Sequence, residues 1–261
     1  MNSTSSTPLD GMIFGFCTVL GVIVTAACLY RVRRSPTIAN KCITFAFGIC
    51  TVGVFFAIPA ISHWVEELTG VDNLPKLTAH ICAIAWCASL QLTMVDIAYD
   101  PHYLRTAIYQ RATVAAAVLL VMIPLWLNAN LPGTEFTTAF ASHVPIRIYL
   151  LVYLGYVFIT CAELAFMCTK SATFNWPGRP WSSIGYGSSA IAAVFGIGYT
   201  ISKGGFLIAL TTGSAWSLKV EEKLSPALSG LAIVFLFIGL TLPVFGVLLR
   251  KIRRKPAPAP K

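Results

Sequence analysis

The sequence predicts an all-α membrane protein, a polytopic bundle of seven transmembrane helices. Of its residues, 56% are hydrophobic and only 11% are charged, whereas a soluble domain carries about 25% charged residues. The apolar residues fall into long runs, and the basic residues gather beside these runs on alternate connecting segments. These observations exclude a water-soluble globule of this size. The placement of the formal charge of +9 is typical of membrane flanks, and it argues against a nucleic-acid partner.

The clearest span lies within residues 66–105. No Asp, Glu, Lys or Arg occurs between Lys76 and Asp96, and about twenty such residues cross a ~30 Å hydrocarbon layer at ~1.5 Å per residue. Acidic residues precede this run and Arg105 follows it. Because Lys and Arg are retained on the cytoplasmic side, we expect this helix to enter from outside and to end inside.

Six further apolar segments surround this span. In chain order, the seven are expected at about 11–30, 42–63, 76–96, 112–130, 148–169, within 184–211 and at about 226–249. The chain is thus divided into a short extracellular N-terminus (1–10), a seven-helix domain (11–249) and a basic, Pro-rich cytoplasmic tail (250–261).

Local signals refine these segments. Pro59 is expected to kink the second segment near its outer end. Thr69-Gly70 is typical of a turn, and Asp72-Asn73 before Pro75 of a helix start. In the first segment, the spacing Gly11-x-x-x-Gly15 would let another helix approach closely.

The basic residues set the expected orientation. Predicted inner positions hold 14 Lys or Arg residues, and predicted outer positions hold 4, namely Lys76, Arg147, Lys219 and Lys223. This bias predicts an outer N-terminus and an inner C-terminus. The first residues lack the basic region of a cleavable signal, so we expect the first segment to remain as an anchor.

The eight cysteines all lie within or at the ends of apolar segments, and no pair has CxxC spacing. This distribution is typical of small buried residues. It predicts neither a disulfide framework nor a zinc site, and no cofactor is expected.

Three stretches resemble a known family. VEELTGVDNLPKLTAHICAIAWCASLQ, IYLLVYLGYVFITCAELAFMCTKSA and FIGLTLPVFG are similar to the corresponding regions of actinobacterial seven-helix membrane proteins. These proteins are described as transporters, without an established activity. The resemblance covers most of the chain, and it implies the seven-helix fold and a transporter-like role. Longer members carry a cytosolic domain after the last helix, with no counterpart in residues 250–261.

The fifth segment carries the most informative face. Its spacing places six residues on one side of a helix, namely Tyr149, Tyr153, Tyr156, Thr160, Glu163 and Met167. A polar and aromatic stripe of this kind is expected to face the bundle interior or a wet cavity. Alternatively, the tyrosines form hydrogen bonds between helices or belong to an interfacial belt.

Glu163 is the acid predicted deepest in the hydrocarbon. A charge there costs ~2.5–3.5 kcal/mol on insertion scales, so the carboxyl should be paired, protonated or solvated. No basic residue is predicted at its depth, and we expect Glu163 to bind a cation or a proton. Lys203 is expected roughly 15 Å away along the membrane normal, at ~1.5 Å per residue, which makes a direct salt bridge improbable.

Lys203 precedes two glycines and allows two interpretations. Gly204-Gly205 is either a functional helix break, as in transporters, or the end of a helix that finishes at residue 202. In the second case Lys203 lies at the outer surface.

The third segment has a second polar face. His80, Ile84, Cys87 and Gln91 share one side of this helix. Gln91 and Thr160 are expected to give hydrogen bonds in a site, whereas His80 is near enough to the outer end to be interfacial. An outer metal or proton-sensing site with His63 and His143 lacks any ligand spacing.

Several specific functions are excluded by missing motifs. No lysine lies between Lys223 and Lys251, where a retinal protein would need one in its last helix. Receptor motifs of the G-protein-coupled class, HExxH and GxSxG are also absent, so an enzyme is the weakest hypothesis.

The leading hypothesis is a small-solute transporter or permease-like protein of the cell membrane. Its site would lie between the third, fifth and sixth helices, and its partners would be the lipid bilayer and a small solute. The alternative is a membrane sensor or scaffold that signals to a cytosolic protein partner through the basic inner loops.

Overall fold

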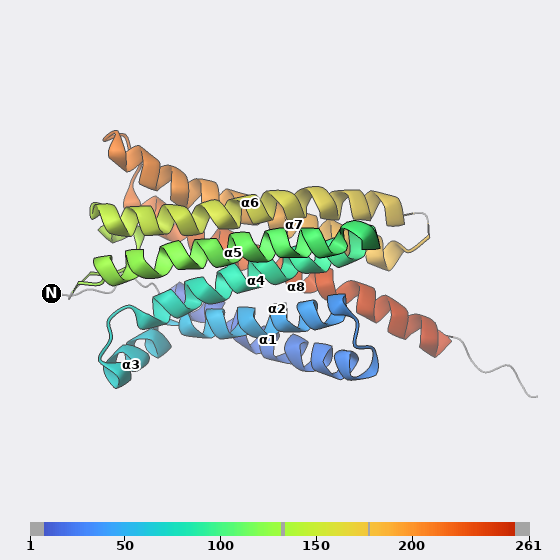
Figure 1. Ribbon diagram of the computed structural model, residues 1–261. Coiled ribbons are helices and arrows are strands. Elements are labelled where there is room, and N and C mark those ends of the chain that lie inside the picture. Colours follow the sequence, from blue (N-terminus) through green and yellow to red (C-terminus); the bar gives the residue numbers. More distant parts are fainter. Residues whose placement is uncertain (1–7, 132–133, 177, 254–261) are drawn as a thin grey trace, which may run out of the picture.

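The computed structural model describes residues 8–131, 134–176 and 178–253, and the predicted features at 1–7 and 254–261 lie outside these ranges. The described chain forms α-helices joined by short connections and one 3-10 turn (Figure 1). The elements are α1 (Pro8–Arg34), α2 (Ile38–Phe56), α3 (Pro59–Thr69), α4 (Leu74–Ala98), α5 (Pro101–Ala129), η1 (Thr138–Phe140), α6 (Val144–Asn175), α7 (Pro180–Thr211) and α8 (Leu218–Arg253).

Seven of these helices are long and apolar enough to cross a bilayer, and α3 is the short exception. Each span has at least 18 residues, close to the about 20 that the hydrocarbon core requires. The predicted all-α bundle of seven transmembrane helices is therefore confirmed, and the protein is a multi-pass integral membrane protein.

Consecutive spans run in opposite directions along the bundle (Figure 1). We call the end that carries α3 the α3 end, and the end at which α1 and α8 finish the distal end. Within the described residues, α1, α2, α4, α6, α7 and α8 contact one another in that order, and α8 returns to α1. The backbones of helices on opposite sides of this ring do not approach each other, so the middle of the ring is left to side chains and a central space. Helix α5 lies outside the ring, on α4 and α6.

The turn before α4 forms as the sequence predicts. Gly70 and Asn73 adopt left-handed conformations, with φ of 65° and 60°. Asn73 is nevertheless buried, and its side-chain nitrogen donates hydrogen bonds to Thr134 O at 2.7 Å and Asn130 Oδ1 at 3.0 Å. These bonds stabilise the strained residue and attach the α3–α4 corner to the connection between α5 and α6.

The second apolar segment is broken rather than kinked. Helix α2 ends at Phe56, and Pro59 begins α3 as a separate helix at the α3 end of the bundle. Proline has no N–H to continue the hydrogen bonds of α2, but its fixed φ suits the first position of a new helix. The expectation of one segment over 42–63 was therefore wrong.

The fourth span begins at Pro101, which is eleven residues before the expected start at 112. Asp100 caps α5 by accepting the His102 N–H at 2.9 Å, and Pro101 occupies the first helical position. As a result, Arg105 and Arg111 lie within a helix, where the sequence interpretation placed them in an inner connection. This shift brings Arg111 beside the ring.

The predicted helix break in the sixth span is absent. Helix α7 continues through Gly204 and Gly205 to Thr211, so neither a break nor an end at residue 202 occurs. The glycine with positive φ after this helix is Gly213, at 70°. The two glycines keep helical geometry because contacts on both sides, to α6 and α8, outweigh their low helix propensity.

Close approach of two helices occurs at Gly239 and not at the predicted Gly11 and Gly15. A Cβ built on Gly11 or Gly15 would meet no atom within 4 Å. In contrast, a Cβ on Gly239 of α8 would lie 2.7 Å from Gly185 O and 2.8 Å from Ser189 N of α7. Small residues at this crossing allow the α7 and α8 backbones to touch.

Candidate functional site

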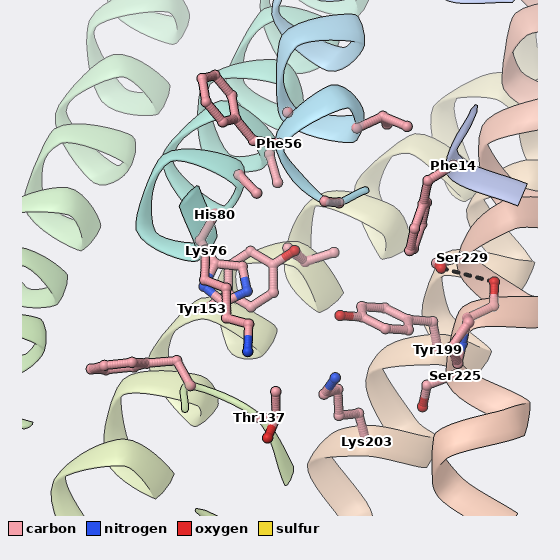
Figure 2. A pocket seen from close by; sticks show the side chains of 18 of the residues that line it. Phe14, Phe56, Lys76, His80, Thr137, Tyr153, Tyr199, Lys203, Ser225 and Ser229 are labelled. Atoms are coloured by element: carbon pink, nitrogen blue, oxygen red, sulfur yellow. Dashed lines mark hydrogen bonds between the residues drawn. The ribbon is translucent and has the colours of Figure 1, made fainter. Parts of the chain in front are cut away.

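A cavity of about 820 Å³ occupies the centre of the ring toward the α3 end (Figure 2). Side chains from α2, α4, α6, α7 and α8 form its walls, and α3 and the connection around η1 contribute to its rim. Its volume lies within the roughly 300–1,000 Å³ that is usual for sites of small organic ligands. The cavity is therefore the best-formed candidate binding site in the described part of the chain.

A histidine and two tyrosines form one wall. The His80 ring stacks on the Tyr153 ring with centroids 4.4 Å apart, and His80 Nδ1 lies 2.9 Å from Tyr149 Oη. Tyr149 is fully buried behind them. His80 thus faces the interior of the bundle and is held by two tyrosines of α6.

Two lysines reach into the same space from different helices. Figure 2 shows Lys76 of α4 and Lys203 of α7 directed into the cavity, and both ammonium groups interact electrostatically with the His80 imidazole. Lys76 Nζ donates to Glu135 Oε2 at 2.6 Å. Lys203 Nζ lies 5.9 Å from the centre of the Tyr199 ring, and no carboxylate of the described residues is within 4.0 Å of it.

The carboxylates near the cavity lie at its rim, in α3, in connections or in the first turn of α8. Glu66 Oε1 accepts the Asn73 N–H at 2.9 Å. Glu221 is only 1% exposed, and it accepts hydrogen bonds from Thr138 at 2.6 Å and from Ser225 at 2.7 Å. Hydrogen bonds within the protein thus hold these two carboxylates in place.

The lower cavity is apolar. Leu90, Leu164 and Leu236 line it, and they belong to a buried cluster that also contains Met94 and Cys168. Because Met94 and Cys168 lie further along α4 and α6 toward the distal end, this cluster closes the cavity below. The cavity therefore lies between the rim at the α3 end and this apolar cluster.

A separate polar network joins α4, α5 and α6 nearer the distal end. Arg111 forms an ion pair with Glu163, and its Nε donates to Glu163 Oε1 at 3.1 Å. Gln91 Nε2 donates to Glu163 Oε2 at 2.7 Å, and Tyr156 Oη donates to Gln91 Oε1 at 3.1 Å. Arg111 also donates to Tyr99 Oη at 3.3 Å. Each of the polar side chains in this network thus has a hydrogen-bond partner of suitable chemistry.

This network corrects the expectation for Glu163. The sequence placed no basic residue at its depth, but the early start of α5 brings Arg111 there. Pairing with a guanidinium satisfies the carboxylate in its charged form, as a partly buried acid requires. Glu163 does not line the cavity, so the described conformation presents it to no solute.

The structure divides the predicted site into two groups. His80, Tyr153 and Lys203 line the cavity, whereas Gln91, Tyr156 and Glu163 belong to the network. Thr160 is fully buried and lines no cavity, and Gly204 and Gly205 lie inside continuous α7. The inward orientation of the stripe on the fifth span is confirmed, and so are hydrogen bonds from its tyrosines to a neighbouring helix.

Sequence reasoning missed Arg111, Lys76, Tyr199 and the rim. The Asp-Pro pair at residues 100–101 is a helix-start signal that would have extended the fourth span and moved Arg111 inward. Tyr199 precedes Lys203 by four residues, so helical spacing alone places both on one face. The contribution of the connection around η1 to the rim has no comparable local signal.

Among the described residues, no group of three or more His, Cys, Asp or Glu side chains is placed to hold a metal ion. The histidines near the α3 end are therefore not brought together as metal ligands. Comparison of the chain with protein-family models, curated proteins and solved structures gave no match.

Proposed function

We propose that this protein is a transporter-like protein of the cell membrane that binds a small organic solute in the central cavity. The observation that carries the proposal is the cavity itself, which combines an apolar lower part with a few convergent polar side chains inside a ring of membrane helices. Sites for small organic ligands are commonly built in this way, between the helices of a bundle.

The closed lower half suits one state of an alternating-access carrier. The leucines at the base of the cavity and the Arg111–Glu163 network keep the distal half packed. Release to the other side would require these contacts to separate. Because α4, α6, α7 and α8 are continuous helices, each would have to move as a whole. A second population with an open distal half is the expected counterpart.

Two substitutions in α7 test the role of the cavity in transport. Ala193 is 5% exposed and lines the cavity, whereas neighbouring Val194 is 60% exposed on the outer face. Ala193→Phe fills the cavity, and Val194→Phe adds the same ring on the lipid side as a matched control. Proteoliposomes would be assayed with radiolabelled amino acids, sugars and organic carboxylates.

We expect the wild-type protein to raise uptake of at least one of these solutes several-fold over empty liposomes. Ala193→Phe should abolish that uptake, and Val194→Phe should retain it. Equal uptake by the Ala193→Phe protein, or no uptake of any solute by the wild type, would contradict the transporter proposal.

The second candidate function is a membrane sensor. It is favoured by the uninterrupted spans and by the apolar cluster that packs below the cavity. A sensor would bind a solute in the same cavity and pass the change to a cytosolic protein partner. Solute-induced thermal stabilisation without flux, together with a cytosolic protein retained in a pull-down, would favour this function.

A further inference from the structure

We propose that the solute is an amphipathic organic anion, whose acidic group contacts Lys203 and whose apolar part fills the lower cavity. This inference rests on the proposed solute-binding function and names the chemical class of its ligand. It is carried by the position of one unpaired cation between a polar rim and an apolar base.

Lys203 is a charged side chain of the cavity wall that lies well inside α7. It lies eight residues before the end of α7 at Thr211, a depth of ~12 Å at ~1.5 Å per residue. It is half-buried, and no carboxylate oxygen of the described residues lies within 4.0 Å of its ammonium group. An ammonium removed from water needs a counter-charge, and a bound anion would supply one.

Three other side chains near Lys203 suit an acidic group. Lys76 adds a second positive charge, shared with Glu135, and the Tyr153 and Tyr199 hydroxyl groups can donate hydrogen bonds to an anion. Figure 2 shows Lys76, Tyr153, Tyr199 and Lys203 around one space, contributed by α4, α6 and α7. Charge-assisted hydrogen bonds from several helices are strong and directional in such a setting.

The carboxylates that line the cavity have partners of their own. Glu135 is paired with Lys76, the Asn73 N–H binds Glu66, and Thr138 and Ser225 hold Glu221. Glu222 also has an interaction partner. Asp72 is exposed in a connection. A cation bound beyond the rim would lie beside Lys203, and repulsion between the two positive charges would oppose it.

The part of the cavity below Lys203 suits an apolar chain. Trp86, Leu90, Leu164 and Leu236 line this region, and removing an alkyl group from water contributes ~0.8 kcal/mol per buried CH₂. A ligand with an acidic head and an alkyl body therefore matches both halves. Such a ligand is either a free carboxylic acid or the acidic headgroup and chains of a membrane lipid.

The test uses the purified full-length protein in phosphatidylcholine nanodiscs. Binding of radiolabelled decanoate is measured, with decyltrimethylammonium and decanol as competitors of equal chain length. The variant is Lys203→Gln, and Lys223→Gln is the matched control, because Lys223 is an exposed lysine at the same end that does not line the cavity. Phosphatidylglycerol added to the nanodiscs distinguishes a lipid ligand, which would displace decanoate, from a free acid.

We expect decanoate to bind at least tenfold more tightly than decyltrimethylammonium. Lys203→Gln should weaken decanoate binding at least tenfold and leave decanol binding within twofold, which also shows that the variant is folded. Lys223→Gln should match the wild type. Equal decanoate affinity in the Lys203→Gln and wild-type proteins, or tighter binding of the cationic probe, would overturn the anion assignment.

Two further outcomes separate this inference from the proposed function. If decanol binds, is excluded by Ala193→Phe and shows no loss to decanoate in competition, the cavity holds solutes but the ligand class is wrong. If the wild type binds none of the three probes, both proposals are contradicted.

Discussion

At the scale of single residues, the ion pair between Arg111 and Glu163 compensates two opposite charges that are partly buried within the bundle. The two side chains are 15% and 23% exposed, so each depends on the other for much of its stabilisation. Removing one partner of a buried pair leaves an uncompensated charge, whereas removing both can be nearly neutral. The pair is therefore better tested by a double-mutant cycle than by one substitution.

We predict that Arg111→Met lowers the free energy of unfolding by ~3 kcal/mol. Glu163→Gln should also destabilise the protein, because it leaves the guanidinium without a carboxylate, and the double variant should recover most of the loss. Unfolding in mixed dodecyl sulfate and dodecyl maltoside micelles measures all three values.

Lys76→Met is the control for this cycle. It breaks the more exposed pair with Glu135, whose side chains are 27% and 36% exposed, and it should cost less than ~1 kcal/mol. A stable Arg111→Met protein would show that Glu163 finds other stabilisation, and it would return the proton-binding interpretation of Glu163 to consideration.

At the scale of the helix, glycines inside different spans differ in how closely a neighbouring helix approaches them. In α7, a Cβ on Gly204 would meet Leu154 Cδ1 at an ordinary 4.0 Å, and one on Gly205 would press on the Trp216 ring at 3.1 Å. In α8, a Cβ on Gly239 would collide with backbone atoms of α7. A tryptophan side chain can shift, but two packed helix backbones cannot separate without loss of contact along their length.

We predict that Gly204→Ala leaves stability unchanged or raises it by up to ~1 kcal/mol, because alanine is the better helix former. Gly239→Ala should lower stability by ~1–3 kcal/mol through overpacking. The same micelle unfolding assay measures both changes. Loss of uptake in a folded Gly204→Ala/Gly205→Ala protein would instead support a functional break at these residues.

At the scale of the whole molecule, the α3 end and the distal end of the bundle differ in charge. Basic side chains such as Arg33, Arg34, Arg105 and Arg179 lie toward the distal end, and acidic side chains gather at the α3 end. With Lys and Arg retained in the cytoplasm, the cavity is expected to open to the outside of the cell.

We predict that cysteines introduced at Asp72 and Lys219 react with an impermeant maleimide on intact cells. Cysteines at Arg105 and Arg179 should react only after permeabilisation. All four positions are exposed, and the wild-type protein controls for its eight cysteines, which are buried or half-buried. Labelling of Arg105→Cys on intact cells would reverse the orientation.

The number of spans and several of their boundaries can be predicted from the amino-acid sequence alone. A helix that crosses the hydrocarbon core needs about 20 predominantly apolar residues, and a run of this length can be recognised directly in the sequence. The turn before α4 was equally accessible, because Gly70 and Asn73 carry a local conformational preference. Helical periodicity also gave the correct inward face of the fifth span, since it depends only on 3.6 residues per turn.

Which helix faces meet cannot be predicted in this way, because it depends on how the helices pack. Arg111 and Glu163 are 52 residues apart, and Lys76 and Glu135 are 59 apart. Their contact depends on the order of helices around the ring, on helix rotation and on the outlying position of α5, none of which a local pattern encodes. The cavity arises for the same reason, because it is the space that remains when the backbones of six helices approach only their neighbours in the ring.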